Sequence, residues 1–220
     1  MEDWDLLRER MVRDQIEWRG IHDSRILEVF RSVPRHNYVP PPYQHAAYED
    51  RPLPIGNGQT ISQPYIVALM TQLMNVQPDE RILEIGSGSG YQAAILSRLA
   101  AHVYSIERIK SLAQQAEKNL SESGVSNVTV FNRDGSLGLE EYSPYDGVLI
   151  TAGAPSIPQP LIDQLKPGGK LVIPVGGRTS QMLKRLIKQA DGSTEIDDLI
   201  PVMFVPLKGK HGWNDDDGVW

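Results

Sequence analysis

The most constraining feature of the sequence is a glycine-rich turn that joins two apolar segments. Its residues, Leu83 to Gly90, read LEIGSGSG, with glycine at every second position from Gly86 onward. Glycine adopts positive φ values easily and lets a ligand approach the main chain closely. A short apolar run before such a turn and an amphipathic run after it are typical of a strand that leads into a helix. The turn therefore predicts an α/β sheet with a ligand at its strand ends, the alternative being a tight turn without a ligand.

Strand and helix patterns alternate along the chain from Arg81 onward. This alternation predicts an α/β fold, a doubly wound and mainly parallel sheet with helices on both faces. The strands are expected at 81–85, 103–106, 128–131, 147–150 and 170–175, and the helices at 91–99, 109–121 and 160–165, the last one stopped by Pro167-Gly168-Gly169.

The pattern near the C-terminus is ambiguous. The apolar residues between Gln181 and Gln189 fit a helix, but the place of this segment after a Gly-Gly turn suits an antiparallel strand equally well. A last strand is expected at 200–207, with a proline near each end. The acidic segment 214–218 is expected to fray.

The first third of the chain lacks the alternating pattern. Two helices are expected near 5–18 and 23–34, and a third begins at Gln63-Pro64-Tyr65. The Pro- and Gly-rich stretch between them, residues 39–60, is either a functional loop or a packed connector. We therefore expect a single domain over 1–220, composed of a helical cap and active-site loop at 1–78, a Rossmann-like core at 79–207 and a tail at 208–220.

Composition excludes several classes of protein and site. Lys and Arg number 22 against 28 Asp and Glu, and a net charge of −6 opposes electrostatic binding of nucleic acid. No cysteine is present, which excludes disulfides and thiolate chemistry, and the five histidines lack metal-ligand spacing. No signal peptide or membrane span is recognisable. We expect a cytoplasmic monomer with no metal and no nucleic-acid or membrane partner.

The glycine spacing helps to choose the ligand. A dinucleotide site requires G-x-G-x-x-G, whereas here Gly90 comes one position early and Tyr91 takes the expected place. The carboxylate of Glu84, just before the first glycine, would repel a pyrophosphate but attract the cationic amino group of S-adenosylmethionine. The turn therefore favours S-adenosylmethionine.

Acidic residues also follow the next two predicted strands. Glu107 lies 21 residues after Gly86, where a carboxylate can accept hydrogen bonds from both hydroxyls of an unphosphorylated ribose. The alternative is a solvated glutamate paired with a neighbouring Arg108 or Lys110. Asp134-Gly135 follows the third strand, where an aspartate can bind the adenine amino group, although Asp-Gly is also an ordinary turn signal.

Hydrolase chemistry is disfavoured. The turn contains a G-x-S-x-G pattern, but glycine rather than a large residue precedes the serine, and no convincing Asp-then-His order follows. Other rivals are a methyltransferase acting on a small molecule or RNA, a silent module that binds the cofactor or damaged peptides, and a nicotinamide oxidoreductase.

Further segments resemble the protein-L-isoaspartate (D-aspartate) O-methyltransferase family. They are Arg51 to Tyr65 (RPLPIGNGQTISQPY), Val33 to His36 followed by Tyr38 to Pro40, and Phe204 to Leu207. The resemblance runs in order from about Met11 to Leu207. It implies a seven-stranded sheet of class I methyltransferase type under an N-terminal helical cap.

The resemblance implies a protein repair enzyme. Such an enzyme transfers a methyl group from S-adenosylmethionine to the α-carboxyl of L-isoaspartyl residues in damaged proteins and peptides, leaving S-adenosylhomocysteine. The ester then closes to a succinimide, and hydrolysis returns part of it to L-aspartyl. The expected cofactor-binding residues are Thr60, Ile61, Ser62, Glu84, Gly86, Ser87, Gly88, Gly90, Glu107, Arg108, Asp134 and Gly135.

The family's active-site serine corresponds to Ser62. A substrate carboxylate is already ionised at pH 7, so the reaction needs no strong base. We expect the Ser62 hydroxyl to align the carboxylate rather than to attack. Thr60, Ser62 and Val205 are expected to bind the substrate peptide, in part through main-chain hydrogen bonds. The alternative for Ser62 is an N-cap of the helix that starts at Gln63-Pro64-Tyr65.

Overall fold

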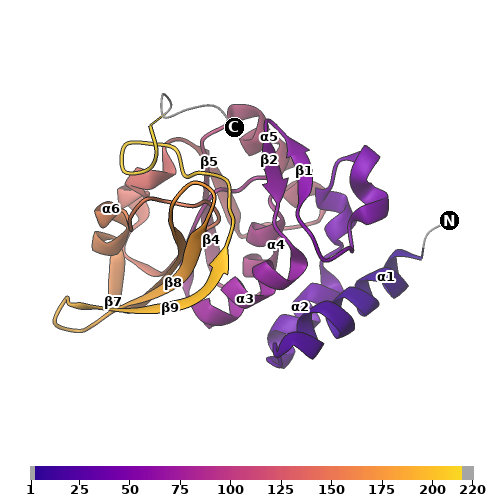
Figure 1. Cartoon of the computed structure of the whole chain (residues 1–220), viewed down its shortest axis with the longest axis horizontal. Helices are drawn as coiled ribbons and strands as arrows, with labels where there is room; N and C mark the ends of the chain where they lie inside the picture. Colours follow the sequence, from indigo (N-terminus) through magenta and orange to yellow (C-terminus); the bar gives the residue numbers. More distant parts are fainter. Residues whose placement is uncertain (1–2, 215–220) are drawn as a thin grey trace.

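A seven-stranded sheet forms the centre of the protein, whose residues 3–214 are described by a computed structural model (Figure 1). The strand order is β5-β4-β3-β6-β7-β8-β9, parallel as far as β7, with β8 antiparallel to both of its neighbours. The predicted doubly wound, mainly parallel sheet is therefore confirmed. The strands are β3 (Arg81–Ile85), β4 (His102–Glu107), β5 (Val128–Asn132), β6 (Tyr145–Ile150), β7 (Leu165–Gly176), β8 (Gln181–Lys188) and β9 (Thr194–Val202).

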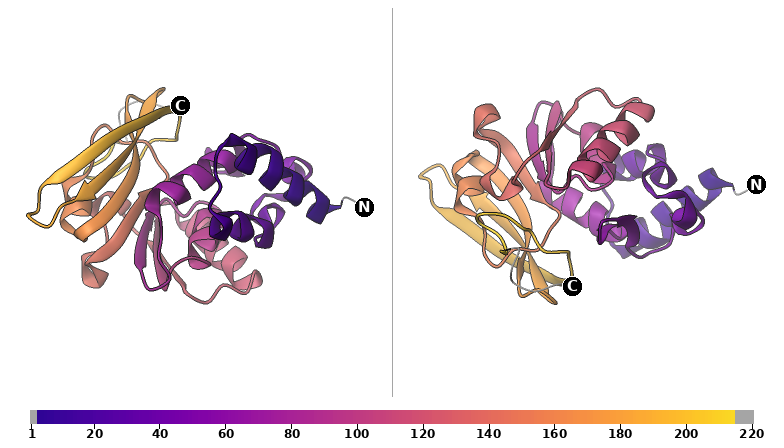
Figure 2. Two further views of the ribbon diagram at one scale, coloured as in Figure 1. Left: turned by 90° about the horizontal axis from the view of Figure 1, so that it is seen from below. Right: turned by 90° about the horizontal axis from the view of Figure 1, so that it is seen from above.

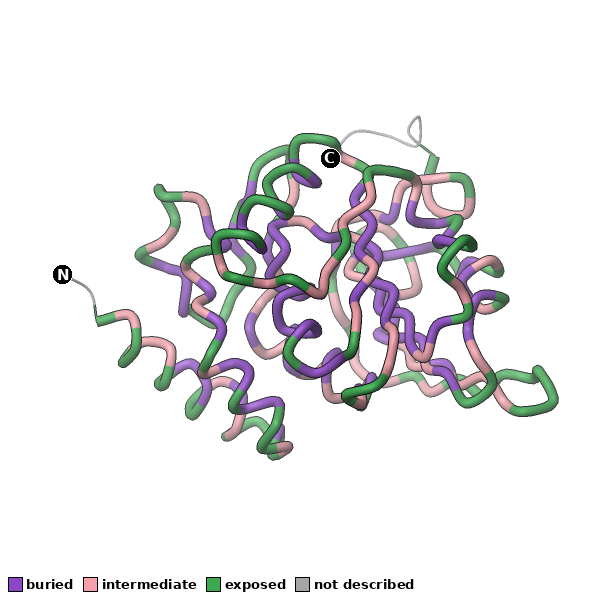
Figure 3. Tube along the Cα trace, turned by 180° about the vertical axis from the view of Figure 1, so that it is seen from behind, coloured by how far each residue is buried: buried purple, intermediate pink, exposed green. Residues whose placement is uncertain are grey.

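The path of the chain opens a crevice between β3 and β6. From β3 it runs outward through α4 (Tyr91–Ser97), β4 and α5 (Lys110–Glu122) to β5, and then returns to β6 on the other side of β3. At such a switch point the connections leave the two strands in opposite directions, so the carboxyl ends of β3 and β6 border an open crevice. Buried residues follow these central strands, and exposed residues lie at the periphery (Figure 3).

The segment between Gln181 and Gln189 is a strand, which resolves the ambiguity of the sequence. β8 pairs with β7 on one side and with β9 on the other. Lys184 and Arg185 lie opposite Asp198 and Asp197 on β9 and form ion pairs with them. These cross-strand ion pairs stabilise the extended conformation. They join residues of two different strands, so the periodicity of one segment does not reveal them.

The expected last strand at 200–207 is wrong from residue 203 onward. β9 ends at Val202, and the following residues turn back to the carboxyl end of β6. There the Gly153 N–H donates to the Val205 carbonyl at 2.8 Å, and the Leu207 N–H donates to the Gly153 carbonyl at 2.8 Å. These bonds draw residues 205–207 into the wall of the crevice instead of the edge of the sheet.

Two boundaries near residue 165 also differ from the prediction. The helix α6 (Gln159–Asp163) is shorter than expected, and β7 begins at Leu165 rather than at residue 170. The expected stop at Pro167-Gly168-Gly169 therefore lies inside the strand. Tyr145 on β6 pairs with Leu165, and the register shifts before Gly147 pairs with Lys170, so the extra residues form an irregularity in the strand.

The N-terminal cap consists of short helical segments. They are α1 (Trp4–Arg10), a π-type segment at Met11–Ile16, a 3-10 turn at Glu17–Arg19, α2 (Ser24–Ser32), and 3-10 turns at Arg35–Tyr38 and Pro41–Ala46. The predicted helix at 5–18 is therefore helical along its whole length but is not one regular α-helix. After α1 the chain widens into the π-type segment and then tightens into the 3-10 turn. The cap lies at one end of the molecule, with β8 and β9 at the other (Figure 2).

A small hairpin connects the cap to the sheet. It consists of β1 (Leu53–Gly56) and β2 (Gln59–Ile61), and the helix α3 (Pro64–Met74) follows it directly. Phe30 of α2, Met70 of α3 and Ile82 of β3 belong to one buried cluster, so the cap and the sheet share a core. A second buried cluster packs on the other face of the sheet.

The first residues of the predicted tail are part of the fold. Lys208 pairs with Trp213, and the Trp213 N–H donates to the Leu207 carbonyl at 2.8 Å. Residues 208–213 thus form what we call the C-terminal strap. Of the acidic segment that was expected to fray, residues 215–218 lie outside the described part of the chain.

Candidate active site

A pocket lies in the crevice at the carboxyl ends of β3, β4 and β6. This inner pocket has a volume of about 120 Å³ and is bordered by the glycine turn, by 106–109, by 151–152 and by 205–208. It adjoins an outer groove of about 800 Å³ between the β1–β2 hairpin and residues 201–206. Thr60, Ser62, Thr151 and Val205 line both cavities. The two cavities together form one site with a deep part and an open part.

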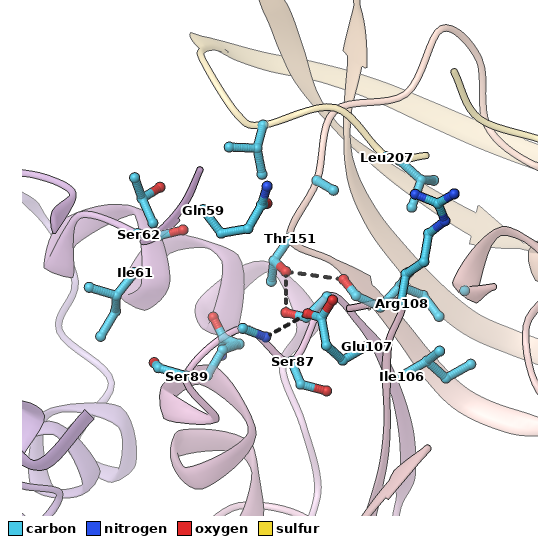
Figure 4. Close-up of a pocket in the computed structure, with 18 of the residues that line it drawn as sticks. Gln59, Ile61, Ser62, Ser87, Ser89, Ile106, Glu107, Arg108, Thr151 and Leu207 are labelled. Atoms are coloured by element: carbon cyan, nitrogen blue, oxygen red, sulfur yellow. Dashed lines mark hydrogen bonds between the residues drawn. The ribbon is translucent and has the colours of Figure 1, made fainter. Parts of the chain in front are cut away.

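The glycine turn is fixed by Thr151 at the end of β6. The Thr151 hydroxyl contacts the Gly86 carbonyl at 2.7 Å and the Ile85 carbonyl at 3.0 Å (Figure 4). Gly86 has a φ of +99°, and a Cβ there would overlap the Thr151 hydroxyl. Both the conformation and the contact require glycine at this position. Sequence reasoning missed Thr151 as a site residue, although its place directly after a central strand could have indicated it.

Glu107 lies in the inner pocket and is only 8% exposed. Its carboxylate accepts the Gly88 N–H at 3.0 Å (Figure 4). It also accepts the Ile109 N–H at 2.8 Å. The alternative of a solvated glutamate paired with Arg108 or Lys110 is therefore wrong. Each carboxylate oxygen can accept a further hydrogen bond, so Glu107 retains capacity for a ligand.

Glu84 lies beneath the turn rather than in the pocket lining. It is fully buried, accepts a hydrogen bond from the Ser105 hydroxyl, and leaves Oε1 without a partner among the described residues. Ser105 in turn contacts the hydroxyl of Ser87, which lines the inner pocket. Burial raises the pKa of Glu84 to about 8, the Ser105 hydrogen bond opposes the rise, and the nearby Glu107 adds to it.

Asp134 and Gly90 are also absent from the pocket lining. Asp134 accepts the Ser136 N–H at 2.9 Å, the Ser136 hydroxyl at 2.7 Å and the Lys210 N–H at 2.8 Å. Burial raises the pKa of Asp134, but these hydrogen bonds outweigh it and leave the pKa below its ordinary value. Gly135 does line the inner pocket. A role for Asp134 or Gly90 in cofactor binding stays a prediction.

Ser62 lies where the inner pocket meets the outer groove. α3 begins at Pro64, its N-cap is Gln63, and no side chain caps it. The expected alternative of a Ser62 N-cap is therefore wrong. Within residues 3–214 the Ser62 hydroxyl makes no hydrogen bond. An unpartnered hydroxyl at the junction of the two cavities is available to a ligand.

The remaining predicted residues also line the site. Thr60, Ile61, Ser87, Gly88, Arg108 and Val205 lie around the inner pocket, which brings together segments from four parts of the sequence. Sequence reasoning missed Lys208, which lines both cavities, and Gln59, which does the same from β2. The outer groove has Lys208 as the one charged side chain among its described lining residues.

Residues 3–214 contain no group of three or more His, Cys, Asp or Glu side chains that could hold a metal ion. They also contain no helix that is long and apolar enough to cross a bilayer.

Comparison with known proteins identifies the family of this chain. The model of the protein-L-isoaspartate(D-aspartate) O-methyltransferase family matches residues 7–212. A protein-L-isoaspartate O-methyltransferase of Methanoregula boonei is 56% identical over 207 residues, which cover 94% of each chain. One from Geobacter metallireducens is 49% identical, covering 97% of this chain and 99% of that protein. The chain belongs to this family.

Solved structures of the family share the fold. One protein-L-isoaspartate O-methyltransferase superposes with a TM-score of 0.84 at 28% identity, over 93% of this chain and 67% of that one. A second, from Plasmodium falciparum, was solved in complex with S-adenosyl-L-homocysteine and gives a TM-score of 0.80 at 27% identity, over 91% and 98% of the two chains. The class I methyltransferase fold of the isoaspartate methyltransferase family is therefore confirmed for this chain.

Proposed function

We propose that this chain carries out the family's repair reaction at the inner pocket and outer groove, with Ser62 aligning the methyl acceptor. Membership of the family makes it an S-adenosylmethionine-dependent methyltransferase that acts on the α-carboxyl of L-isoaspartyl residues. The methyl ester closes spontaneously to a succinimide, and hydrolysis of the succinimide returns part of the damage to L-aspartyl.

The charge of the inner pocket fits the cofactor. S-adenosylmethionine would supply a methyl group on a positively charged sulfonium. The buried Glu107 carboxylate places negative charge at the glycine turn, and the buried Glu84, whose Oε1 has no partner among the described residues, can add a second negative charge by releasing its proton when a cation binds. Opposite charges attract strongly where water is excluded. Ser87, Gly88, Glu107 and Gly135 would line the cofactor, with Glu84 beneath them.

Ser62 would position the acceptor carboxylate. Because this carboxylate is ionised at pH 7, the site needs no general base, and histidine is absent from the described lining of either cavity. A serine hydroxyl can donate one hydrogen bond to a carboxylate oxygen. The second oxygen is then oriented toward the inner pocket, and orientation of this kind contributes much of the rate of a displacement reaction.

The outer groove suits an extended peptide. One edge of β2 pairs with β1, and the other edge borders the groove without a strand partner in the described chain. Unpaired strand edges bind peptides through main-chain hydrogen bonds, which are independent of the peptide's side chains. Thr60 and Ser62 on one wall and Val205 on the other would hold the backbone, and Lys208 would attract the acceptor carboxylate.

The observation that carries the proposal is the unpartnered Ser62 hydroxyl between the two cavities. The test measures transfer of labelled methyl from S-adenosylmethionine to two synthetic peptides that differ only in L-isoaspartyl versus L-aspartyl. Wild-type protein should label the isoaspartyl peptide alone, as a base-labile ester. We expect Ser62→Ala to lower kcat at least tenfold, since it removes the aligning hydrogen bond.

Ser121→Ala, on the exposed face of α5, is the matched control and should leave transfer unchanged. If Ser62→Ala retains wild-type activity, Ser62 does not align the acceptor, but the proposed reaction stands. Absence of label on both peptides, with cofactor binding measured separately, would overturn the repair function.

We further propose a monomer that works in the cytoplasm without nucleic-acid partners. The net charge of −6 supports the last point, because binding to a phosphate backbone requires excess positive charge. Sedimentation velocity of the full chain tests the oligomeric state.

A further inference from the structure

Arg35 is a buried charge that the reaction described above does not use. It is fully buried and is the one buried Lys or Arg in residues 3–214. It makes no ion pair within the described chain. Burying a charge without a counter-ion is costly unless hydrogen bonds replace its water. The hydrogen bonds of Arg35 must therefore compensate for the cost of burying its charge.

Those contacts tie together the loop that carries Ser62. Arg35 Nε donates to the Ala47 carbonyl at 2.8 Å, and Arg35 Nη2 donates to the Ser62 carbonyl at 2.8 Å. Ala47 and Ser62 flank the β1–β2 hairpin, so the guanidinium joins the two ends of this hairpin. The planar fork of arginine suits two acceptors at once, which the point charge of lysine does not.

The guanidinium also reaches the glycine turn. Its central carbon lies 5.0 Å from the centre of the Tyr91 ring, at a distance typical of cation–π contacts. Tyr91 follows Gly90, begins α4 and lines the inner pocket. Arg35 thus contacts both the segment that presents the acceptor-binding hydroxyl and the segment that would hold the cofactor.

The Ser62 side chain depends on its backbone for its position. Its hydroxyl has no hydrogen bond within the described chain, and the helix that follows is not capped by a side chain. The backbone on either side is held by the pairing of Ile61 with Leu53 and by Arg35. Removing the Arg35 bond would free the Ser62 peptide unit while the rest of the hairpin stayed paired.

We propose that Arg35 is a positioning residue, which fixes Ser62 relative to the inner pocket by holding the Ser62 carbonyl. This inference rests on the proposed function, because the position of Ser62 matters only if its hydroxyl aligns the acceptor. Arg35 then acts through Ser62 and contacts no reacting atom.

A double-mutant cycle tests the inference. Arg35→Lys, Ser62→Ala and the double variant are compared with wild type for kcat and KM toward the isoaspartyl peptide and for the dissociation constant of S-adenosylhomocysteine. Arg35→Lys should lower kcat about tenfold and change cofactor affinity less than twofold, because a lysine keeps a cation near Tyr91 but loses the bond that holds the Ser62 carbonyl. In the Ser62→Ala background the same change should have almost no further effect on kcat. Rates are normalised to the number of cofactor-binding sites, so that loss of folded protein does not count as loss of kcat.

Arg25→Lys is the matched control. Arg25 donates to the Val76 carbonyl at 3.2 Å, so the substitution also weakens an arginine-to-backbone bond, but outside both cavities. Should Arg35→Lys fold poorly, Arg35→Gln provides a neutral donor in the same cycle. If Arg35→Lys lowers kcat equally in the wild-type and Ser62→Ala backgrounds, the inference is overturned. An unchanged kcat in either single variant, Arg35→Lys or Ser62→Ala, would also overturn it. Failure of the repair function itself is distinct, since wild type would then leave the isoaspartyl peptide unlabelled.

Discussion

Among residues 3–214, Arg35 and Glu84 are the two Lys, Arg, Asp or Glu side chains with no exposed surface, and they remain inside the protein by different means. Arg35 keeps its charge through hydrogen bonds to carbonyls, and burial lowers its pKa only to about 10, still above neutral pH. Glu84 has one hydrogen bond and a partnerless oxygen, so its proton is retained up to about pH 8. A carboxyl of this kind can respond to a cation in the adjoining pocket by losing its proton.

Glu84 makes the stability of the protein depend on pH. Its pKa rises from an ordinary 4.5 to about 8 on folding, so between these values the folded state holds a proton that the unfolded chain has lost. Its favourable contribution is complete below about pH 4.5 and is lost as pH rises through about 8. Glu84→Gln mimics the protonated acid and should flatten this part of the dependence. Thermal unfolding of both proteins from pH 5 to 9 measures it, and parallel curves would contradict the assignment.

At the scale of elements, the site is assembled from loops that leave the sheet on one side and from two segments that arrive from elsewhere. The hairpin β1–β2 comes from the N-terminal third, and the C-terminal strap comes from beyond the last strand. Lys210 and His211 of the strap donate to Asp134 and Ser136 after β5, and the Trp213 indole donates to the Gly153 carbonyl at 3.1 Å. The strap thereby holds Leu207 and Lys208 at the inner pocket.

Ser136→Ala should loosen the strap. The variant loses the hydroxyl that accepts the His211 N–H at 3.0 Å and donates to Asp134, and each such bond contributes about 1 kcal/mol. We expect faster hydrogen exchange in residues 208–213 and about fivefold weaker binding of S-adenosylhomocysteine. Both are measured by exchange mass spectrometry and calorimetry.

Ser193→Ala is the matched control for the strap variant. Ser193 donates its N–H and its hydroxyl to Asp191 in the β8–β9 turn, as Ser136 does to Asp134, but it contacts no part of the strap. Unaltered exchange of residues 208–213 in the Ser136 variant would show that the strap is held without this serine.

At the scale of the whole molecule, the cap and the sheet are expected to unfold together. Both contribute to the same buried cluster, and Phe30 of α2 meets Tyr91 of α4 edge to face at 6.3 Å between ring centres. A shared core of this size favours a single cooperative transition. The cap, core and tail would then be distinct in position but would unfold as one cooperative unit.

Phe30→Ala should destabilise the entire chain. Phe30 is fully buried, and truncating such a side chain typically costs about 3–5 kcal/mol. In a background with Trp213→Phe and Trp220→Phe, tryptophan fluorescence reports on Trp4 and Trp18 in the cap. Urea unfolding followed by this fluorescence should coincide with unfolding followed by circular dichroism of the sheet. Two separate transitions, with only the first shifted by the substitution, would show that the cap is an independent unit.

The sequence by itself determined the central α/β sheet and the glycine turn, and it singled out Glu107 and Ser62, which line the pocket at the strand ends. These conclusions follow from periodicity and spacing between chain neighbours, and from a run of residues that the family shares. Only the tertiary structure decided that 181–189 is a strand, that Asp134 binds the strap, and that Arg35 holds Ser62. Each of the latter depends on a partner that is distant along the chain, Asp198 for Lys184 or Lys210 for Asp134. The energy of such contacts exists only once the fold has brought the partners together, so no local pattern encodes them.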